Sequence, residues 1–496
     1  MAKGASWLVS ARLMNKGIGF ISTMILARLL VPSDFGLVAM AMVIVTILQI
    51  VNTYSMQVFL VQKDDLTRND LNAAWTLQII FGLFQGVILV LVSGPMAKFF
   101  DEMRLVSIYW ALAGMMFLYG FKNIGVMYFQ REMRFHMEFL LIGARKIGSF
   151  IITLTLALIF RSYWALIIGI ITGNIIEVVL SYVFHSYRPG IHLKNWKELF
   201  KFTKWIYINN ILNFMKNKGP QFIIGKLCSS GSLGIFSVSY DIAMLPTTEM
   251  VAPINRAIFP GYASMREDEG ALREGYLSVL SMIALIALPC AFGIAATADV
   301  MIPLLLGSKW VEAVPIVKIL ALSGGFVSLQ SNSAAVYIGK GMPWISTYVN
   351  ALWVPLVLIL IIIFTMYWNI IGSSLAFLCT SIIMFPVNII IIISLLKIKL
   401  TQYLKCIYRP LVCSLVMFYI VNFRLMSLIQ NEFNNNLLFT SCILIIFGIL
   451  IYAFCVLFLW FISGKQMGAE KYFIKLLTSK IETFLINKNL LVKAAK

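Results

Sequence analysis

The stretch Ile25-Leu-Ala-Arg-Leu-Leu-Val-Pro-Ser-Asp-Phe-Gly-Leu-Val-Ala-Met40 decides how this chain folds, because the chain contains it twice. The second copy is Ile223-Ile-Gly-Lys-Leu-Cys-Ser-Ser-Gly-Ser-Leu-Gly-Ile-Phe-Ser-Val238. Arg28 matches Lys226 and Gly36 matches Gly234, at an offset of 198 residues (226 − 28). Each copy has a cation and a leucine, a short polar turn, and a glycine that begins a new apolar run. A helical hairpin used twice predicts two homologous membrane lobes.

The composition indicates that lipid is the solvent for most of the chain. The 496 residues are 60% hydrophobic and only 12% charged, which is too apolar for a soluble domain. Because a membrane helix needs about 20 mostly apolar residues, we expect an all-α polytopic membrane protein with about fourteen spans. The expected spans lie within residues 7–30, 35–61, 73–94, 105–124, 138–160, 163–185, 202–226, 233–258, 276–298, 313–338, 344–366, 369–396, 404–424 and 437–462.

The repeat also predicts how these spans divide into domains. We expect two pseudo-symmetric six-helix lobes, two further helices, and a basic amphipathic tail that lies on the cytoplasmic leaflet. The corresponding ranges are 1–190, 191–400, 401–463 and 464–496.

The basic residues predict the orientation in the membrane. The termini and the loops after even-numbered spans hold 26 lysines and arginines, whereas the loops on the other side hold seven. Cytoplasmic loops carry the excess of basic residues, so we expect both termini in the cytoplasm. The same excess accounts for most of the net charge of +19, and no nucleic-acid partner is needed to explain it.

Motifs for catalysis or cofactor binding are missing from the sequence. There is no G-x-x-x-x-G-K-[ST] loop, no H-E-x-x-H pair and no G-x-S-x-G elbow. The seven cysteines are scattered through apolar runs without metal-ligand or disulfide spacing. The expected loops on the outer side are short. We therefore expect a protein that is not an enzyme and has no cofactor or metal.

Two groups of polar residues lie inside expected spans. Arg12 and Lys16 are four residues apart in the first span and share one helix face, with Asn15 beside them. Because a basic side chain at a helix centre costs about 2.5–3.5 kcal/mol, we expect such residues to line a wet cavity between the lobes. The alternative is that they extend toward the cytoplasmic surface.

The seventh span holds the matching group. Lys216 and Lys218 lie near its middle, and Asn213 matches Asn15 at the offset of 198. The two lysines are about 200° apart on a regular helix, so they cannot share one face unless the adjacent Gly219-Pro220 pair breaks the helix.

Acidic residues are rarer inside the spans. Glu177, Asp241 and Glu249 are candidates for coupling to an ion or for balancing the cations. Packing of an ion pair is the alternative for Asp241 and Glu249. Arg145 and Lys146 open the fifth expected span, and we expect them to anchor the helix at the leaflet. A cavity with excess positive charge suits an anion, phosphate in particular.

At this point the sequence resembles a known family. The first hairpin copy, together with Ile254-Asn-Arg-Ala-Ile-Phe-Pro-Gly-Tyr-Ala-Ser-Met265, resembles the Wzx-type oligosaccharide flippases, most of all the colanic-acid type. These flippases form the polysaccharide-transporter branch of the multidrug/oligosaccharidyl-lipid/polysaccharide exporter superfamily. The resemblance covers residues 5 to about 460 and does not identify the sugar.

The resemblance implies alternating access that moves an undecaprenyl-pyrophosphate-linked oligosaccharide from the cytoplasmic to the outer leaflet of a bacterial inner membrane. It implies that glycan and pyrophosphate cross through the cationic cavity while the polyprenyl tail stays among membrane lipids. Polysaccharide polymerase and chain-length proteins are implied as further partners. The substrate residues would be the two groups already described, and we expect the hairpins to form an outward gate with the residues Arg28, Gly36, Lys226 and Gly234.

Three other functions stay open from the sequence. A drug–cation antiporter of the same superfamily would need net acidic residues in the cavity, whereas the embedded charges here lean basic. A polysaccharide polymerase or ligase that uses the same carrier would need substantial outward loops. A scaffold for glycosyltransferases is the third alternative.

Overall fold

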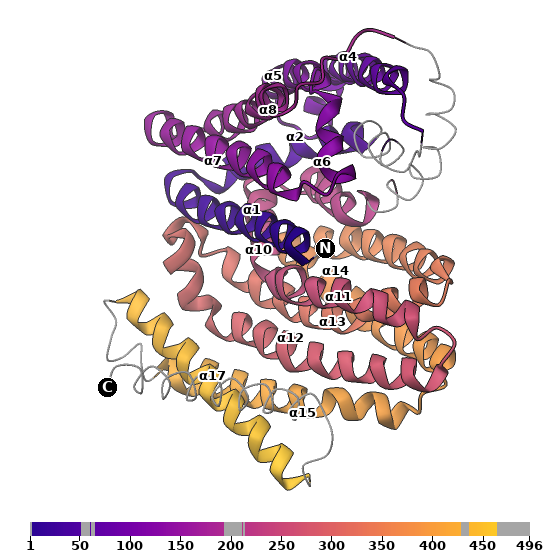
Figure 1. Ribbon diagram of the computed structural model, residues 1–496. Coiled ribbons are helices and arrows are strands. Elements are labelled where there is room, and N and C mark those ends of the chain that lie inside the picture. The colour runs from indigo at the N-terminus through magenta and orange to yellow at the C-terminus, as the bar shows by residue number, and fades with distance from the viewer. Residues whose placement is uncertain are drawn as a thin grey trace, which may run out of the picture. The chain divides into compact units, whose positions relative to one another are not determined.

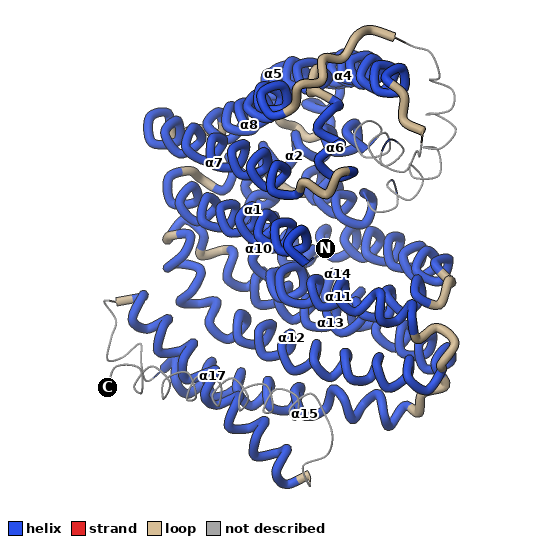
Figure 2. Tube along the Cα trace, viewed as in Figure 1, coloured by secondary structure: helices blue, strands red, loops and turns tan. Residues whose placement is uncertain are grey.

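Helices make up every regular element that the structure describes. This computed structural model describes residues 2–50, 60, 65–192, 211, 214–427 and 436–463, and the tube in Figure 2 shows no strand among them. The all-α prediction is confirmed. Helices suit a bilayer because they satisfy their own backbone hydrogen bonds where no water is present. The expected tail at 464–496 lies outside the described residues.

The helices that place the candidate site come first in the chain. In order they are α1 (Ala2–Leu29), α2 (Pro32–Ile50), α4 (Arg68–Phe99), α5 (Arg104–Gly120), η1 (Ile124–Met127), α6 (Tyr128–Arg131), α7 (Phe135–Phe160) and α8 (Trp164–Phe184). The rest are α10 (Ser230–Ala243), η2 (Pro246–Val251), α11 (Ala252–Ser264), α12 (Glu269–Leu306), η3 (Ser308–Trp310), α13 (Ala313–Gly339), α14 (Pro343–Leu396), α15 (Leu400–Tyr419), η4 (Ile420–Leu425) and α17 (Leu437–Ile462).

Membrane-length helices recur along the chain, as expected. Within the described ranges nine helices are long and apolar enough to cross a membrane, and α5 with the bent η1–α6 segment makes ten. The helix α14 contains two expected spans, because Trp368 and Asn369 leave helical dihedrals between them. With 28 residues, α1 is long enough but is not among the nine, since its basic residues lower its apolarity.

The Cα positions group the chain into two compact units. The first unit contains residues 1–238, 305–312 and 354–373, and the second contains the remainder. These bounds differ from the expected lobes, which rest on the repeat alone and stay a prediction. One reason is that the helix over 214–227 packs with the N-terminal helices, where Phe222 stacks on Phe99 at 5.0 Å between ring centroids.

Small residues allow close helix packing in the first unit. The helix α7 lies beside α1 (Figure 1), and Trp7 meets Phe139 across that contact at 5.0 Å between ring centroids. On its other side α7 packs on α8, where the Ser149 hydroxyl donates to the Gly169 carbonyl at 2.8 Å. Small and hydroxylated residues at such contacts are typical of membrane helices.

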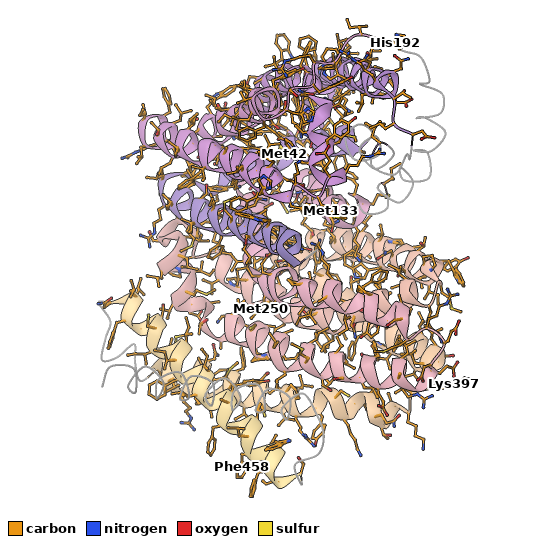
Figure 3. The ribbon with its side chains drawn as sticks, in the orientation of Figure 1. Met42, Met133, His192, Met250, Lys397 and Phe458 are labelled. Atoms are coloured by element: carbon orange, nitrogen blue, oxygen red, sulfur yellow. The ribbon has the colours of Figure 1, made fainter. Side chains whose placement is uncertain are left out.

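The second unit packs α11, α12, α13, the second half of α14, α15 and α17 around its own apolar core. Polar side chains of α13 connect its neighbours: Ser323 and Ser381 share a hydrogen bond of 2.7 Å, and Asn255 donates to Ser331 at 2.8 Å. Outer faces are apolar, and Phe458 on α17, labelled in Figure 3, is 55% exposed. Such faces suit contact with lipid.

Candidate functional site

The two hairpin copies meet at their matching glycines. Gly36 of α2 and Gly234 of α10 are both buried in the first unit. A Cβ added to Gly36 would overlap the carbonyl of Ser230 and lie 3.0 Å from the Gly234 nitrogen. A Cβ added to Gly234 would overlap the carbonyl of Pro32 and lie 2.9 Å from the Gly36 nitrogen. Pro32 and Ser230 are also 198 residues apart (230 − 32), so the contact has local two-fold symmetry.

Side chains from other segments hold this contact together. The indole Nε1 of buried Trp310 donates to the carbonyl of Ala27 at 2.8 Å, near the end of α1. Its ring meets Phe35 edge-on at 5.2 Å between centroids. This hydrogen bond satisfies a carbonyl that would otherwise be buried without a partner. The packing of Trp310 therefore fixes the start of the first hairpin.

The loop between α4 and α5 binds the second hairpin through charged groups. Lys226 pairs with Asp101 at 3.4 Å and lies over the ring of Phe99 at 5.3 Å. Arg104 donates two hydrogen bonds of 2.7 Å to the Glu102 carboxylate, which also accepts one from Ser230 at 3.4 Å. The hydrogen bonds from Arg104 hold the pKa of Glu102 below its ordinary value. Arg28, the expected counterpart of Lys226, is exposed.

The cations expected in the first span lie well inside α1. Lys16 is near the middle of this 28-residue helix, and its side chain is exposed, as is that of Asn15. Arg12 is half-buried. The structure therefore places these three polar residues inside a helix that is long enough to cross a membrane.

The lysines of the matching group are on the helix over 214–227, and both are half-buried. Lys218 donates to Gln221 at 2.9 Å. The helix continues through Gly219 and Pro220, so the break that would let both lysines share one face is not present. A proline removes one intrahelical hydrogen bond, and such a loss is tolerated inside membrane helices. The remaining expected member, Asn213, lies outside the described residues.

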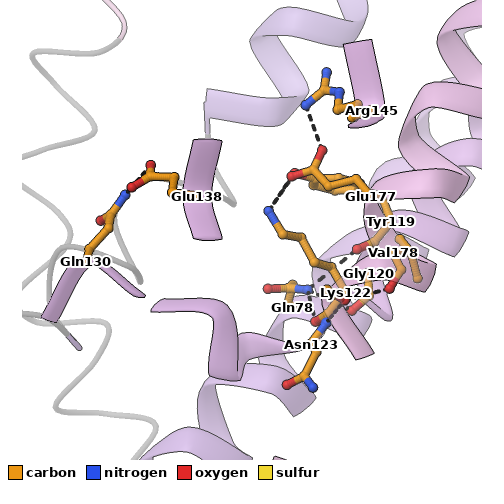
Figure 4. Close-up of polar contacts among 11 residues, drawn as sticks. Gln78, Tyr119, Gly120, Lys122, Asn123, Gln130, Glu138, Arg145, Glu177 and Val178 are labelled. Atoms are coloured by element: carbon orange, nitrogen blue, oxygen red, sulfur yellow. Dashed lines mark hydrogen bonds and ion pairs between the residues drawn. The ribbon is translucent and has the colours of Figure 1, made fainter. Parts of the chain in front are cut away.

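A cluster of charged side chains in the first unit surrounds Glu177 of α8. Lys122, at the end of α5, donates to its Oε1 at 2.5 Å, and Arg145 of α7 donates to its Oε2 at 2.6 Å, as Figure 4 shows. Tyr119 adds a third hydrogen bond of 3.3 Å. Both Glu177 and Lys122 are buried, whereas the side chain of Arg145 is 46% exposed.

Neighbouring backbone contacts fix the position of Lys122. The amide of Gln78 donates to the Lys122 carbonyl at 3.0 Å. The next residue, Asn123, donates its backbone N–H to the Ser181 hydroxyl at 2.9 Å and its side-chain amide to the Tyr187 carbonyl at 2.8 Å. This tight turn therefore directs the Lys122 side chain into the packed helices, although Lys122 is at the end of the expected span 105–124 and counts as a loop cation in the charge distribution.

Arg145 and Lys146 lie deeper than the sequence predicts. Helix α7 begins at Phe135, ten residues before Arg145, which corresponds to a rise of about 15 Å. The Lys146 Nζ lies beside α1 at Gly19, from which an added Cβ would be 3.5 Å away. Lys146 is also within electrostatic reach of Lys16 and Arg145. The expected role as leaflet anchors stays a prediction.

The other two acidic candidates lie in the consecutive elements α10, η2 and α11. Asp241 is exposed on α10, and Glu249 is half-buried on the π-helical turn η2. Glu249 lines an otherwise apolar pocket of about 510 Å³ in the second unit. The pocket walls come from η2, α12, α15 with η4, and α17, and include Ile286, Cys290, Met417 and Leu444.

The ion pair between Lys318 and Asp299 was not predicted from the sequence. Lys318 of α13 and Asp299 of α12 pair at 2.6 Å in the second unit. Two signals were available in the sequence. Asp299 is a carboxylate at the end of one expected span, and Lys318 lies five residues after Ala313, the first residue of the next helix. Because both side chains stay about one-third exposed, this pair suits an ordinary helix contact near a surface.

Comparisons with known proteins agree with this architecture. A family model described as "Polysaccharide biosynthesis protein" matches residues 25–315. The chain is 23% identical to the lipopolysaccharide biosynthesis protein WzxC of Escherichia coli (strain K12), over 83% of this chain and 85% of that protein. It is 21% identical to the succinoglycan biosynthesis transport protein ExoT of Rhizobium meliloti (strain 1021), over 69% of each.

A solved structure shares the fold. The lipid II flippase MurJ in an inward closed conformation superposes with a TM-score of 0.72, at 13% sequence identity, over 91% of this chain and 98% of that one. At this identity the likeness concerns the fold alone. The expected all-α, multi-pass architecture is confirmed.

Proposed function

The chain belongs to the polysaccharide biosynthesis protein family, and on that premise we propose that it is a flippase for lipid-linked oligosaccharides. Its substrate is an oligosaccharide repeat unit joined through pyrophosphate to undecaprenol. The protein moves this unit from the cytoplasmic to the outer leaflet of a bacterial inner membrane by alternating access. It is a transporter and performs no bond chemistry on its substrate.

One observation carries the proposal: membrane-length helices of the first unit hold several cations far from their ends. Lys16 lies near the middle of α1, and Arg145 lies ten residues inside α7. Each of these two side chains would cost about 2.5–3.5 kcal/mol in contact with lipid. A water-filled path beside them would avoid this cost. A path lined by cations favours an anionic group such as pyrophosphate, which guanidinium and ammonium groups recognise.

The candidate substrate residues follow from this reasoning. Arg12, Asn15, Lys16, Lys216 and Lys218 contact the pyrophosphate and glycan in the proposed mechanism. All five belong to the first unit. Asn213 belongs to the same set by its sequence position. The neutral and cationic donors in this set match the hydroxyl-rich and anionic parts of the substrate.

The lipid part of the substrate needs a different environment. The pocket lined by α12, α15 and α17 is almost entirely apolar and has a volume of about 510 Å³. Burial of hydrocarbon in such a pocket is favourable by about 25 cal/mol per Å² of apolar surface. This supports a carrier with a long hydrocarbon tail that stays at the lipid side while its polar head crosses.

The hairpin contact supplies the proposed outward gate. With both termini in the cytoplasm, as the distribution of basic residues favours, the Gly36–Gly234 contact faces the outer leaflet. In the proposed cycle the two hairpins separate to release the glycan. Arg28 and Lys226 stand beside the opening, and Lys226 must then leave Asp101.

Acidic residues provide the proposed link to an ion gradient. Asp241 and Glu249 can take up a proton or a cation during the cycle, whereas Glu177 balances the charges of Lys122 and Arg145. Polysaccharide polymerase and chain-length proteins are the proposed partners on the outer side, where the product is used.

A second candidate function has one specific observation in its favour. Glu249 lines an apolar pocket, and a carboxylate in such surroundings suits a lipophilic cation. A drug–cation antiporter would therefore use this pocket rather than the cations of α1 and α7. Loss of drug resistance in a Glu249→Gln variant, with normal polysaccharide display, would favour this candidate.

The flippase proposal is tested in a host that displays the polysaccharide. The Lys216→Ala/Lys218→Ala variant should insert at the normal level yet abolish display and accumulate the lipid-linked precursor. A Lys98→Ala/Lys309→Ala variant, which removes two exposed cations elsewhere, serves as the matched control and should display normally. Normal display by the Lys216/Lys218 variant would contradict the cavity assignment.

A further inference from the structure

A short non-helical segment, residues 185–192, carries the chain away from α8. We call this segment the strap. It lies against α4, where two of its groups share one acceptor. The Tyr187 phenol donates to the Asn72 side-chain oxygen at 2.6 Å, and the Gly190 N–H donates to the same oxygen at 2.9 Å. A segment without helical or sheet hydrogen bonds needs other partners for its backbone groups, and Asn72 supplies one of them.

Two further hydrogen bonds complete the docking of the strap. The N–H of His192, which Figure 3 labels, donates to the Thr76 hydroxyl at 2.9 Å. Thr76 lies four residues after Asn72, so the two side chains share one face of α4. From the turn that follows α5, the Asn123 side-chain amide donates to the Tyr187 carbonyl at 2.8 Å. Side chains of the first unit therefore dock the strap along its length.

The imidazole of His185 lies at the start of the strap and contacts it directly. Its Nδ1 accepts the Tyr187 N–H at 3.1 Å. Its ring stacks on Tyr128 of α6 at 5.6 Å between centroids, with an angle of 3° between the planes. A Cβ added to Gly125 of η1 would overlap Nδ1, so the ring fits only against a glycine. An acceptor at Nδ1 requires the neutral imidazole, because the imidazolium carries N–H groups at both nitrogens.

The surroundings of His185 also favour the neutral ring. His185 follows the last residue of α8 and lies outside this membrane-length helix. Partial burial lowers the pKa of His185 below its ordinary value of 6.5. Glu132 opposes this shift, and two nearby arginines reinforce it. Among the described residues, the charged and titratable groups around the ring are Glu132, Arg134, Arg188, Tyr128 and Tyr187.

This difference in pKa makes the docking of the strap depend on pH. A histidine that is harder to protonate in the docked state than in the released state opposes docking once it is charged. Docking is therefore fully present above pH 6.5 and is lost as the pH falls through the lowered pKa of docked His185.

From these contacts we propose that the strap is a pH-sensitive switch: neutral His185 keeps it docked on α4, and protonation of His185 releases it. The Tyr187 N–H then faces a second donor, and the phenol and carbonyl of Tyr187 lose their alignment with Asn72 and Asn123. Because the strap leads from α8 toward the helix over 214–227, its release loosens the connection between the two copies of the repeat. With the orientation that the basic residues favour, the strap faces the cytoplasm and responds to cytoplasmic acid. The switch does not depend on the substrate.

Hydrogen–deuterium exchange of the full chain in nanodiscs measures docking directly. The amide hydrogens of Tyr187, Gly190 and His192 are the backbone donors of the strap, and mass spectrometry of peptides over 185–192 follows their exchange. After correction for the intrinsic exchange rate, their protection should fall several-fold between about pH 7.5 and about pH 5.5. Protection in α12 should stay unchanged, since only the strap is released.

The His185→Asn variant separates the charge of the ring from its hydrogen bond. The asparagine oxygen stands where Nδ1 stands along the side chain and can accept the Tyr187 N–H, but it takes up no proton. Protection of the strap should therefore be high at both pH values in this variant. His136→Asn is the matched control, because it removes a histidine of α7, and it should keep the acid response of the parent. Asn72→Ala should exchange quickly at both pH values, because the shared acceptor is lost.

Four results would overturn the switch. Protection of the strap in the parent protein could stay constant between the two pH values. The His185→Asn variant could lose protection in acid as the parent does, or the acid response could disappear in His136→Asn. A loss of protection that extends to α12 would mean that acid unfolds the protein and does not release the strap alone.

Discussion

Gly36 and Gly234, 198 residues apart in the chain, contact each other's helix so closely that neither position has room for a Cβ. Each glycine lies against the carbonyl of the residue four positions before the other glycine. The two copies of the repeat therefore contact each other directly, and each hairpin uses the same surface for this contact. This relationship gives the outward-gate proposal its sharpest test.

Gly36→Ala and Gly234→Ala should each separate the hairpins. The added methyl group overlaps a backbone carbonyl that cannot rotate away, and overpacking of this kind costs about 1–3 kcal/mol. Cys228, half-buried between the helix over 214–227 and α10, reports the change. Burial raises the pKa of the Cys228 thiol and slows its modification, so opening should accelerate labelling by a membrane-impermeant maleimide.

The control for this labelling is Gly94→Ala, since a Cβ added to Gly94 meets no atom within 4 Å. A Cys228→Ser background identifies the signal from the other cysteines. Unchanged Cys228 labelling in both glycine variants would contradict the gate assignment.

Replacement of Trp310 by phenylalanine should destabilise the first hairpin. The change keeps a ring beside Phe35 but leaves the carbonyl of Ala27 without its donor, which costs about 1–3 kcal/mol. Thermal unfolding of purified protein measures the loss. Trp344→Phe, at a tryptophan that is 52% exposed, should leave the midpoint unchanged, and an equal effect of both variants would exclude a special role for Trp310.

A double-mutant cycle should reveal strong coupling between Lys122 and Glu177. Glu177→Gln leaves Lys122 buried without a carboxylate, so this change alone should cost about 3–5 kcal/mol. Lys122→Met should cost less, because Arg145 still pairs with Glu177. The combined variant should lose much less than the sum of the two. Additive losses in unfolding free energy would mean that the pair contributes no coupling.

Acid should weaken the contact between the α4–α5 loop and the second hairpin. Because Arg104 lowers the pKa of Glu102 from 4.5, this carboxylate stabilises the folded state fully above pH 4.5. Its contribution disappears as the pH falls through the lowered folded value. The difference in unfolding midpoint between the parent and Glu102→Gln should therefore be present at neutral pH and vanish in acid. A difference that persists in acid strong enough to protonate this carboxylate in both the folded and the unfolded state would refute the role of the Glu102 charge.

Some of the fold follows directly from the sequence. Apolar runs predict the helices, and the gap between the expected spans at 344–366 and 369–396 matches the break at Trp368 and Asn369. The offset of 198 predicts that Gly36 and Gly234 are equivalent. It does not predict that they touch, because equivalence concerns each hairpin alone and contact depends on how the hairpins pack.

The charge cluster shows where sequence reasoning fails. Lys122 lies at the end of the expected span 105–124 and is counted with the loop cations, but tertiary hydrogen bonds at Asn123 turn it toward Glu177. Arg145 is assigned to a leaflet because hydropathy hides the first turns of α7, which contain His136 and Glu138. Local apolarity therefore locates spans well and locates their ends poorly.

Leaflet transfer in reconstituted liposomes tests the central claim most directly. The purified protein is incorporated with a defined undecaprenyl-pyrophosphate-linked oligosaccharide, and transfer is followed by glycan accessibility to an external glycosidase, with and without an ion gradient. The account predicts transfer by the parent protein and by the Lys98→Ala/Lys309→Ala control, and none by the Lys216→Ala/Lys218→Ala variant. Equal rates in protein-free liposomes and in liposomes with the parent protein, under every gradient, would contradict it.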